Sequence, residues 1–336
     1  MSLLHKFKNI IGNYRLIQKT TSALSGDISV FCYHKVTNLN VGKLLKTPDE
    51  HLSINTNIFD KQIKYMSENF KIIDSYDLLN FDKIQSIKQK KIIITFDDGY
   101  LDNLINALPI LKKYNAKATI FITTNFINDN ETPWWDRLWI ILKKKDEFFF
   151  NEEKFSFLGK DDNRIRLFNH LKEKFFLLKK NEQKDLFDQI LTENKIELTI
   201  TSKQNFLNEK DIKKVSSEKL LRIGSHTHNH QNLNLLNNEE KKNEILTSKE
   251  ILENIIKKEV DLFAYPYGIK SAYQKEDFKI LKENNIKLAF TTNFDNYKIQ
   301  SHSPFLIPRM GLGNTNNNKS IRDKIYGLDS LIKKIC

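Results

Sequence analysis

The amino-acid sequence predicts an α/β fold in which parallel strands alternate with helices, interrupted once by an inserted, mainly helical subdomain. Three observations predict it. Short β-type runs recur along the chain, helical repeats of apolar residues lie between several of them, and this rhythm fails only between about residues 126 and 217. About seven such units favour a barrel over an open sheet, although hydrophobic periodicity alone does not settle closure.

The expected strands are β-type runs bounded by polar or turn-forming residues. They lie at 27–34, 91–96, 117–123, 220–226, 261–266, 287–292 and 304–310. Between them, apolar residues recur at the i, i+4, i+7 spacing that predicts one buried helical face. Examples are the set Phe59, Ile63 and Met66 and the set Leu104, Leu108 and Leu111.

The interruption has its own pattern, which predicts helices and one hairpin. In "TPWWDRLWIILKKK" we expect Thr132 as the N-cap and Pro133 as the first helical residue. The run 147–158 alternates around a polar turn, and two further helical stripes follow. The tryptophans could stack on sugar rings, but packing is the favoured interpretation. The barrel is therefore expected over 1–125 and 218–336, and the inserted subdomain over 126–217.

Composition narrows the class of protein. The net charge of +12 is compatible with anionic partners, but the lysines are scattered over many expected helix faces and no nucleic-acid recognition motif occurs. Two cysteines make no disulfide framework. Without a signal-like or membrane-spanning apolar stretch, a cytoplasmic enzyme is the expectation. Residues 3–18 could form a basic amphipathic helix that touches the inner face of a membrane, although a packing helix is favoured.

Two adjacent acids end one expected strand. In "IIITFDDGY" (92–100), Asp97 and Asp98 follow an apolar run directly. Their like charges repel and their burial is costly, so the pair indicates a bound cation, a proton or water. A pair of acids that merely caps the next helix would explain one Asp and leave the other without a role.

A histidine cluster follows another expected strand. In "IGSHTHNH" (223–230), His226 and His230 are four residues apart, which lets two imidazoles converge on one ion, while His228 is expected to point elsewhere. Two histidines and one carboxylate would form a facial set of ligands with open positions for water and substrate. Both segments are expected at the carboxyl ends of strands, at one mouth of a barrel. One acid would then bind the metal while the other stands beside its water.

These motifs carry a family resemblance. "TFDDGY", "SHTHNH" and "FAYPYG" (263–268) occur in the order found in polysaccharide deacetylases, carbohydrate esterase family four. "FCYHKV" (31–36) resembles the branch of the biofilm poly-N-acetylglucosamine deacetylases, and "PWWDRL" (133–138) resembles deacetylase-like proteins of capsule and lipopolysaccharide synthesis. The resemblance implies a distorted barrel of about seven strands and a divalent metal, usually zinc.

The resemblance also implies roles for single residues. Asp97 corresponds to the general base, and Asp98 corresponds to the metal ligand that acts with His226 and His230. His34, in the motif shared with the biofilm branch, is the expected general acid.

A second group of roles follows from the third motif, which in the family usually reads Arg-x-Pro-Tyr and whose arginine orients the base. Here Ala264 stands in place of that arginine. Tyr265, Pro266 and Tyr267 are expected to line the substrate site. Arg309 is the candidate replacement for the missing arginine.

Together these observations predict a metal-dependent hydrolase that removes N-acetyl groups from an amino sugar of a surface glycan or its lipid-linked precursor. The bound ion would lower the pKa of water and polarise the acetamide carbonyl. Two alternatives stay open. The missing arginine motivates a non-catalytic carbohydrate-binding protein on a degenerate barrel, and a sugar deformylase would use the same chemistry.

Overall fold

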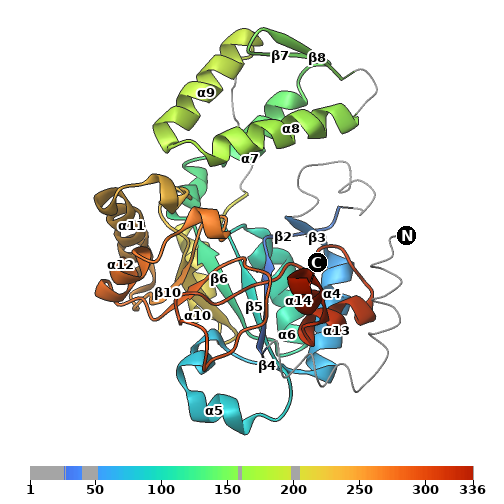
Figure 1. Ribbon diagram of the computed structural model, residues 1–336, viewed down its shortest axis with the longest axis vertical. Coiled ribbons are helices and arrows are strands. Elements are labelled where there is room, and N and C mark those ends of the chain that lie inside the picture. Colours follow the sequence, from blue (N-terminus) through green and yellow to red (C-terminus); the bar gives the residue numbers. More distant parts are fainter. Residues whose placement is uncertain (1–25, 27, 40–51, 158–160, 198–204, 336) are drawn as a thin grey trace.

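The computed structural model describes residues 26, 28–39, 52–157, 161–197 and 205–335 (Figure 1). Its centre is a seven-stranded parallel sheet with the strand order β1-β5-β6-β9-β10-β11, and β4 pairs with β5 beside this path. The strands are β1 (Ile28–Tyr33), β4 (Lys71–Ile72), β5 (Lys91–Phe96), β6 (Ala118–Ile122), β9 (Leu221–Ser225), β10 (Leu262–Ala264) and β11 (Leu288–Phe290). The predicted α/β architecture of about seven strands is confirmed.

The central strands are buried on both faces, because one face packs against helices and the other packs against other strands inside the barrel. Every residue of β1 and β5 is buried. Such strands read as continuous apolar runs rather than as alternating ones. Thr95, a polar residue within β5, donates its hydroxyl hydrogen to the carbonyl oxygen of Phe31 at 2.9 Å, which satisfies it inside the core.

The two ends of the sheet are joined by the segment 305–310. Ile307 makes a parallel bridge to Phe290 in β11, and Met310 makes one to Phe31 in β1. The segment therefore curls the sheet toward a barrel. It does not form the regular strand predicted for 304–310, because Pro304 and Pro308 have no N–H to donate to a ladder. The seventh strand of the sheet is instead the two-residue β4, which the sequence pattern did not predict.

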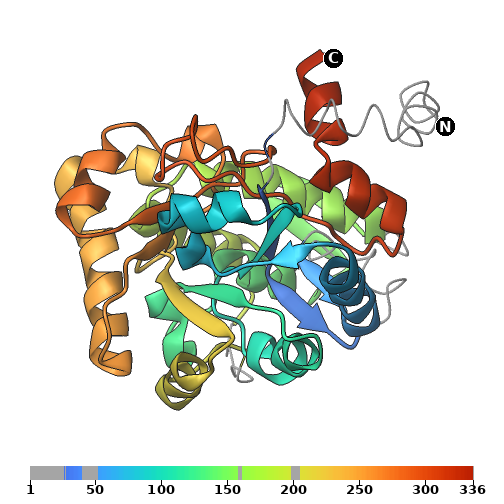
Figure 2. The same ribbon diagram turned by 90° about the horizontal axis from the view of Figure 1, so that it is seen from below.

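Helices surround the sheet (Figure 2). They are α4 (Thr56–Asn69), α5 (Phe81–Ser86), α6 (Leu108–Lys113), α10 (Glu209–Ser217), α11 (Asn238–Ile256), α12 (Asp277–Glu283), α13 (Asn318–Ile325) and α14 (Leu328–Ile335), with a π-helical turn, η3 (Asn103–Ala107), leading into α6. Short 3₁₀ helices are η2 (Ser75–Leu79), η4 (Thr124–Asp129), η5 (Leu233–Leu235) and η6 (Lys270–Ala272). The strands β2 (Lys35–Thr37) and β3 (Ser53–Asn55) pair with each other. None of the helices in these described ranges is long and apolar enough to cross a membrane. The helix expected over 3–18 lies outside the described residues.

The interrupting region forms a separate group of elements at the top of Figure 1. It holds α7 (Trp134–Leu142), an antiparallel hairpin of β7 (Glu147–Phe150) and β8 (Glu153–Ser156), α8 (Asp161–Phe176) and α9 (Lys180–Glu193). The predicted hairpin is confirmed. The predicted start of α7 was wrong by one residue, because Pro133 has an extended ψ of 143° and is itself the N-cap.

This group has its own apolar cluster, distinct from the cores of the barrel. The cluster includes Phe126, Trp134, Trp135, Leu138, Phe148, Leu171, Phe175, Phe187, Ile190 and Phe206. By contrast, Ile212 and Val215 of α10 belong to the main core of the barrel. We therefore propose that the inserted subdomain ends before α10 and is slightly shorter than the predicted 126–217.

Candidate active site

The adjacent acids lie where β5 gives way to a turn. The amide of Asp97 donates to the carbonyl oxygen of Tyr33 at 2.9 Å, which extends the pairing of β5 with β1 by one residue. Asp98 then adopts a φ of 73° and Gly99 one of 81°. A positive φ is rare outside glycine and turns the backbone sharply. The two carboxylates consequently leave the strand in different directions.

The histidines lie on the turn that follows β9. The amide of His226 donates to the carbonyl oxygen of Ile122, and Thr227 and His230 both have positive φ values, of 64° and 55°. Glu244 on α11 accepts a hydrogen bond from the amide of Asn229 at 2.8 Å, which ties the turn to the helix. The turn brings His226 and His230 to one side. His228 points elsewhere, as expected, and lies 2.9 Å from the hydroxyl of Thr124.

Asp98, His226 and His230 converge on one point inside the protein. The Nε2 atoms of His226 and His230 lie 3.6 and 3.5 Å from Oδ1 of Asp98, and the three candidate ligand atoms are all within 4.8 Å of one another. All three side chains are buried. Nδ1 of His226 lies 2.8 Å from the carbonyl oxygen of Ala264, which directs its Nε2 toward Asp98.

The residues of this group fit a divalent cation. Oδ1 of Asp98 has no hydrogen-bond partner among the described residues, although buried carboxylate oxygens are normally satisfied. Burial and the neighbouring charge of Asp97 raise the pKa of Asp98 well above its usual range, so a cation here would offset both costs. Burial lowers the pKa of both histidines, which leaves neutral imidazoles able to act as ligands. Two histidines and one carboxylate are a donor set typical of catalytic zinc.

Asp97 is held by Arg309 instead. The two guanidinium nitrogens Nη1 and Nη2 donate to Oδ1 and Oδ2 of Asp97 at 2.6 and 2.7 Å. Burial alone would raise the pKa of Asp97. The charge and hydrogen bonds of Arg309, together with the nearby His226 and His34, outweigh burial and hold that pKa well below the usual range. Arg309 comes from the segment that closes the sheet. Its guanidinium lies against Asp97, where an arginine was expected to replace the one missing from the third motif.

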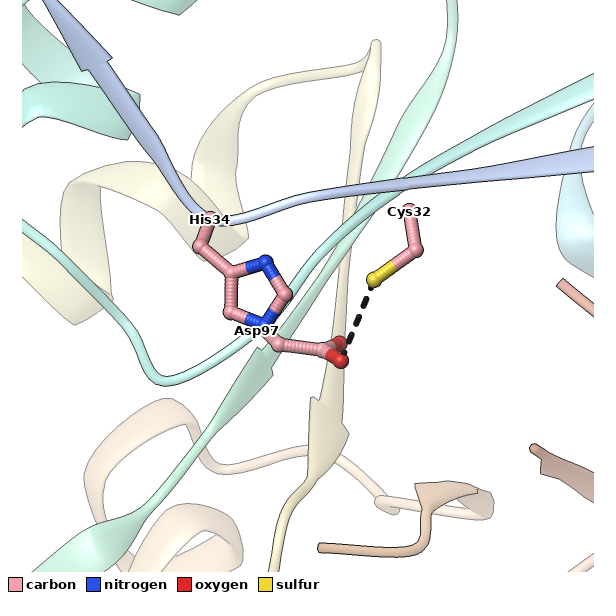
Figure 3. A group of neighbouring side chains, drawn as sticks. All are labelled: Cys32, His34 and Asp97. Atoms are coloured by element: carbon pink, nitrogen blue, oxygen red, sulfur yellow. Dashed lines mark hydrogen bonds between the residues drawn. The ribbon is translucent and has the colours of Figure 1, made fainter. Parts of the chain in front are cut away.

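A second group of ligand-type side chains surrounds the same carboxylate. Cys32 and His34 both point toward Asp97 (Figure 3), and candidate ligand atoms of the three residues lie within 4.8 Å of one another. The Cys32 thiol donates to Oδ2 of Asp97 at 3.3 Å. A metal is disfavoured here, because both oxygens of Asp97 already accept from the positive Arg309. Burial lowers the pKa of His34 to about 4, so its imidazole is neutral near pH 7.

Cys32 was missed in the sequence, where it passes for one more apolar residue of a strand. The signal that could have found it is its spacing from His34. Residues i and i+2 of a strand point to the same face. A histidine at the end of a strand therefore marks residue i−2 as a neighbour in the site.

Of the three residues of the third motif that were expected to line the substrate site, only the last has a side chain that reaches it. Tyr265 is fully buried in a core cluster and its hydroxyl donates to the carbonyl oxygen of Phe305, so its side chain does not join the site. Pro266 is also buried. Tyr267 does reach the site, because its ring centroid lies 4.9 Å from that of His230. Its φ of 60° and the following Gly268 form a tight turn, in which a Cβ added at Gly268 would lie 2.6 Å from the amide nitrogen of Thr292.

The fold and the donor set define a class: α/β-barrel proteins with a candidate metal centre at the carboxyl ends of the strands. The family model described as polysaccharide deacetylase matches residues 85–147 and 169–289, more than half of the chain. The chain therefore belongs to the polysaccharide deacetylase family. The unmatched stretch between the two segments, residues 148–168, covers most of the hairpin and the first half of α8.

Single relatives agree with this family. YxkH of Bacillus subtilis (strain 168), which carries the name of a polysaccharide deacetylase, is 33% identical over 99 residues, or 28% of this chain. That match spans 31% of the relative, so less than a third of its length. The chain is similar in fold to the deacetylase PplD of Streptococcus pyogenes, solved with acetate (TM-score 0.58, 19% identity, 90% of this chain and 99% of that one). It is also similar to IcaB of Ammonifex degensii (TM-score 0.52, 14% identity, 90% and 99%).

Proposed function

We propose that this protein is a metal-dependent N-deacetylase acting on an amino sugar of a surface glycan or of its lipid-linked precursor. One observation carries the proposal. A buried Asp–His–His donor set lies directly beside a carboxylate whose charge and orientation are fixed by a buried arginine. The set could hold a cation, and the fixed carboxylate could accept a proton from water next to it.

Asp98, His226 and His230 would hold the metal, with Zn²⁺ the cation that fits this donor set best. Such an ion would lower the pKa of a water molecule and polarise the acetamide carbonyl. Asp97 then accepts the proton of that water at a carboxylate oxygen, as a general base. Arg309 keeps the carboxylate ionised and aimed while this happens.

The leaving nitrogen needs a proton, because an amide nitrogen departs poorly as an anion. His34 is the proposed donor. It is neutral near pH 7, so it can donate only after receiving a proton, and Asp97 is the neighbour that can supply the one it took from water. The C–N bond breaks, the carbonyl carbon keeps the new oxygen, and the products are acetate and a free amino sugar.

The alternative of a degenerate, non-catalytic barrel rested on the missing arginine of the third motif. The contact of Arg309 with Asp97 weakens that alternative, because the base has an arginine from another segment. The expected peripheral membrane contact rests on residues outside the described part of the chain and stays a prediction.

The test measures acetate and formate release by the purified full-length chain, loaded with zinc or stripped by a chelator. The substrates are N-acetylated and N-formylated sugars presented as lipid-linked, nucleotide-linked and polymeric forms. Acetate release that depends on added metal supports the proposal. Formate release without acetate would show a deformylase, and sugar binding without either product would show a binding protein.

A further inference from the structure

The first turn of α7 contacts three separate parts of the proposed site. Nε1 of Trp134 donates to the hydroxyl oxygen of Tyr267 at 3.1 Å. The ring of Trp135 lies against the His230 ring at a centroid distance of 5.0 Å and an angle of 65°. Asp136 forms an ion pair of 3.0 Å with Lys35, the residue that follows His34.

These three contacts cannot all come from one face of the helix. Consecutive helical residues point about 100° apart, so three in a row cannot face a single flat surface. Trp134 and Trp135 are each only 8% exposed, and the side chains of Asp136 and Lys35 are 18% and 16% exposed. The start of α7 is therefore enclosed partly by the proposed site and partly by α8 of the insertion, on whose Phe175 the Trp134 ring stacks.

His230 gives this contact a particular meaning. A metal-binding histidine normally donates its second ring nitrogen to a hydrogen-bond acceptor, which fixes the ring. His226 has such a partner in the carbonyl oxygen of Ala264, whereas Nδ1 of His230 has none within the described ranges. The His230 ring is held by aromatic rings instead, with Trp135 and Tyr267 at 5.0 and 4.9 Å and Phe126 at 6.4 Å.

We propose that Trp135 and Asp136 are positioning residues for the deacetylation proposed above, on which this inference rests. Trp135 holds the His230 ring so that its Nε2 faces Asp98, in place of the missing hydrogen bond. The pair of Asp136 with Lys35 fixes the segment that carries His34. The inserted subdomain thus sets the geometry of the site through one helix, rather than serving as a sugar-stacking platform.

The Trp135 part is tested by the zinc dissociation constant, measured by competition with a chromophoric chelator. We expect Trp135→Leu to raise this constant by about 10- to 100-fold, the usual cost of losing a partner that orients a ligand. Trp135→Phe keeps an aromatic ring and should restore most of the affinity. Trp139→Leu is the matched control, because Trp139 lies on the same helix and contacts Phe168 within the insertion. It should lower the unfolding midpoint and leave the zinc constant unchanged.

The Asp136 part is tested by steady-state acetate release. In zinc-saturated protein, Asp136→Asn should lower kcat and leave KM unchanged, because it loosens the segment that carries His34. Saturating zinc is needed because the charge of Asp136 also acts on Asp98. Asp188→Asn, which breaks an exposed pair with Lys184, is the control and should leave both KM and kcat unchanged.

The outcomes separate this inference from the proposed function. Wild-type protein that binds no zinc and releases no acetate overturns both. If the wild-type protein binds zinc and releases acetate, and Trp135→Leu has the same zinc affinity as Trp139→Leu, only the role of Trp135 is overturned. An unchanged kcat in Asp136→Asn overturns the role of Asp136.

Discussion

Arg309 and Asp97, 212 residues apart in the sequence, are joined by two hydrogen bonds of 2.6 and 2.7 Å. The guanidinium is fixed in turn, because its Nε donates to the carbonyl oxygen of Thr291 at 3.0 Å and its Nη1 also contacts the hydroxyl of Thr95 at 3.2 Å. A planar guanidinium matches a carboxylate with two parallel bonds, which fixes direction as well as charge. The proposed base is therefore held in place without the arginine that the third motif lacks.

Arg309→Lys should lower turnover by about 10- to 100-fold while the protein keeps its metal, since an ammonium group cannot make the two parallel bonds. Arg309→Met should also destabilise the fold by about 3–5 kcal/mol, because it leaves Asp97 buried and uncompensated. Acetate release, zinc content and urea unfolding measure these effects. Arg222→Lys, at a half-buried pair with Asp74, is the control. Normal turnover in Arg309→Lys would contradict the positioning role.

The two adjacent acids should respond differently to the same substitution. Asp97→Asn should keep stoichiometric zinc and lose about 10²–10⁴-fold in turnover, because an amide cannot accept the proton. Asp98→Asn should lose zinc, because a neutral amide oxygen is a poorer ligand, and added zinc should partly restore its activity. Elemental analysis beside acetate release checks both. If Asp97→Asn lost the metal and Asp98→Asn kept it, the two roles would have to be exchanged.

The histidine turn supplies its own control. His226→Ala and His230→Ala each remove a proposed ligand, so zinc content and turnover should fall together. His228→Ala changes the same turn, but its side chain contacts Thr124 and not the proposed metal site. That variant should keep its zinc. Stoichiometric zinc with near-normal turnover in either ligand variant would show that the ligand assignment is wrong.

Cys32 should have a smaller effect than Arg309, because a thiol is a weak hydrogen-bond donor. We expect Cys32→Ala to keep its zinc and to lose no more than about tenfold in turnover, which corresponds to ~1.4 kcal/mol. Cys32→Ser, which keeps a donor, should lie closer to wild type. Loss of zinc in Cys32→Ala would indicate that the thiol is itself a metal ligand.

A stability prediction concerns Lys241 and Asp277, an ion pair of 2.6 Å whose side chains are 1% and 0% exposed. Asp277→Ala should cost about 3–5 kcal/mol in the free energy of unfolding, because it leaves the Lys241 ammonium buried and unpaired. The double variant Lys241→Met with Asp277→Leu should recover much of that loss. The exposed pair of Lys279 and Glu283 is the comparison, and Glu283→Ala should cost less than about 1 kcal/mol. Urea denaturation of the three variants beside wild type separates these cases.

Much of the fold could be predicted from local sequence patterns. The apolar runs that became β1, β5 and β6 are buried on both faces, so each is recognisable without knowledge of its neighbours. The two-residue β4 carries too few residues to show a period, and it pairs with the start of β5, ahead of the stretch of β5 that pairs with β6. The closing segment 305–310 looked like a strand by composition, but its prolines limit it to isolated bridges.

The sequence by itself determined the family. It also marked the two acids and the two histidines as candidate site residues, because each pair lies within a few residues at the end of one strand. Local backbone chemistry suffices to aim such groups. Only the tertiary structure decided that Arg309 meets Asp97, that the Cys32 thiol contacts the same carboxylate, and that the Trp135 ring lies against His230. Those contacts join segments far apart in the chain. They form only when the sheet closes and α7 packs against the site, so no local sequence pattern predicts them.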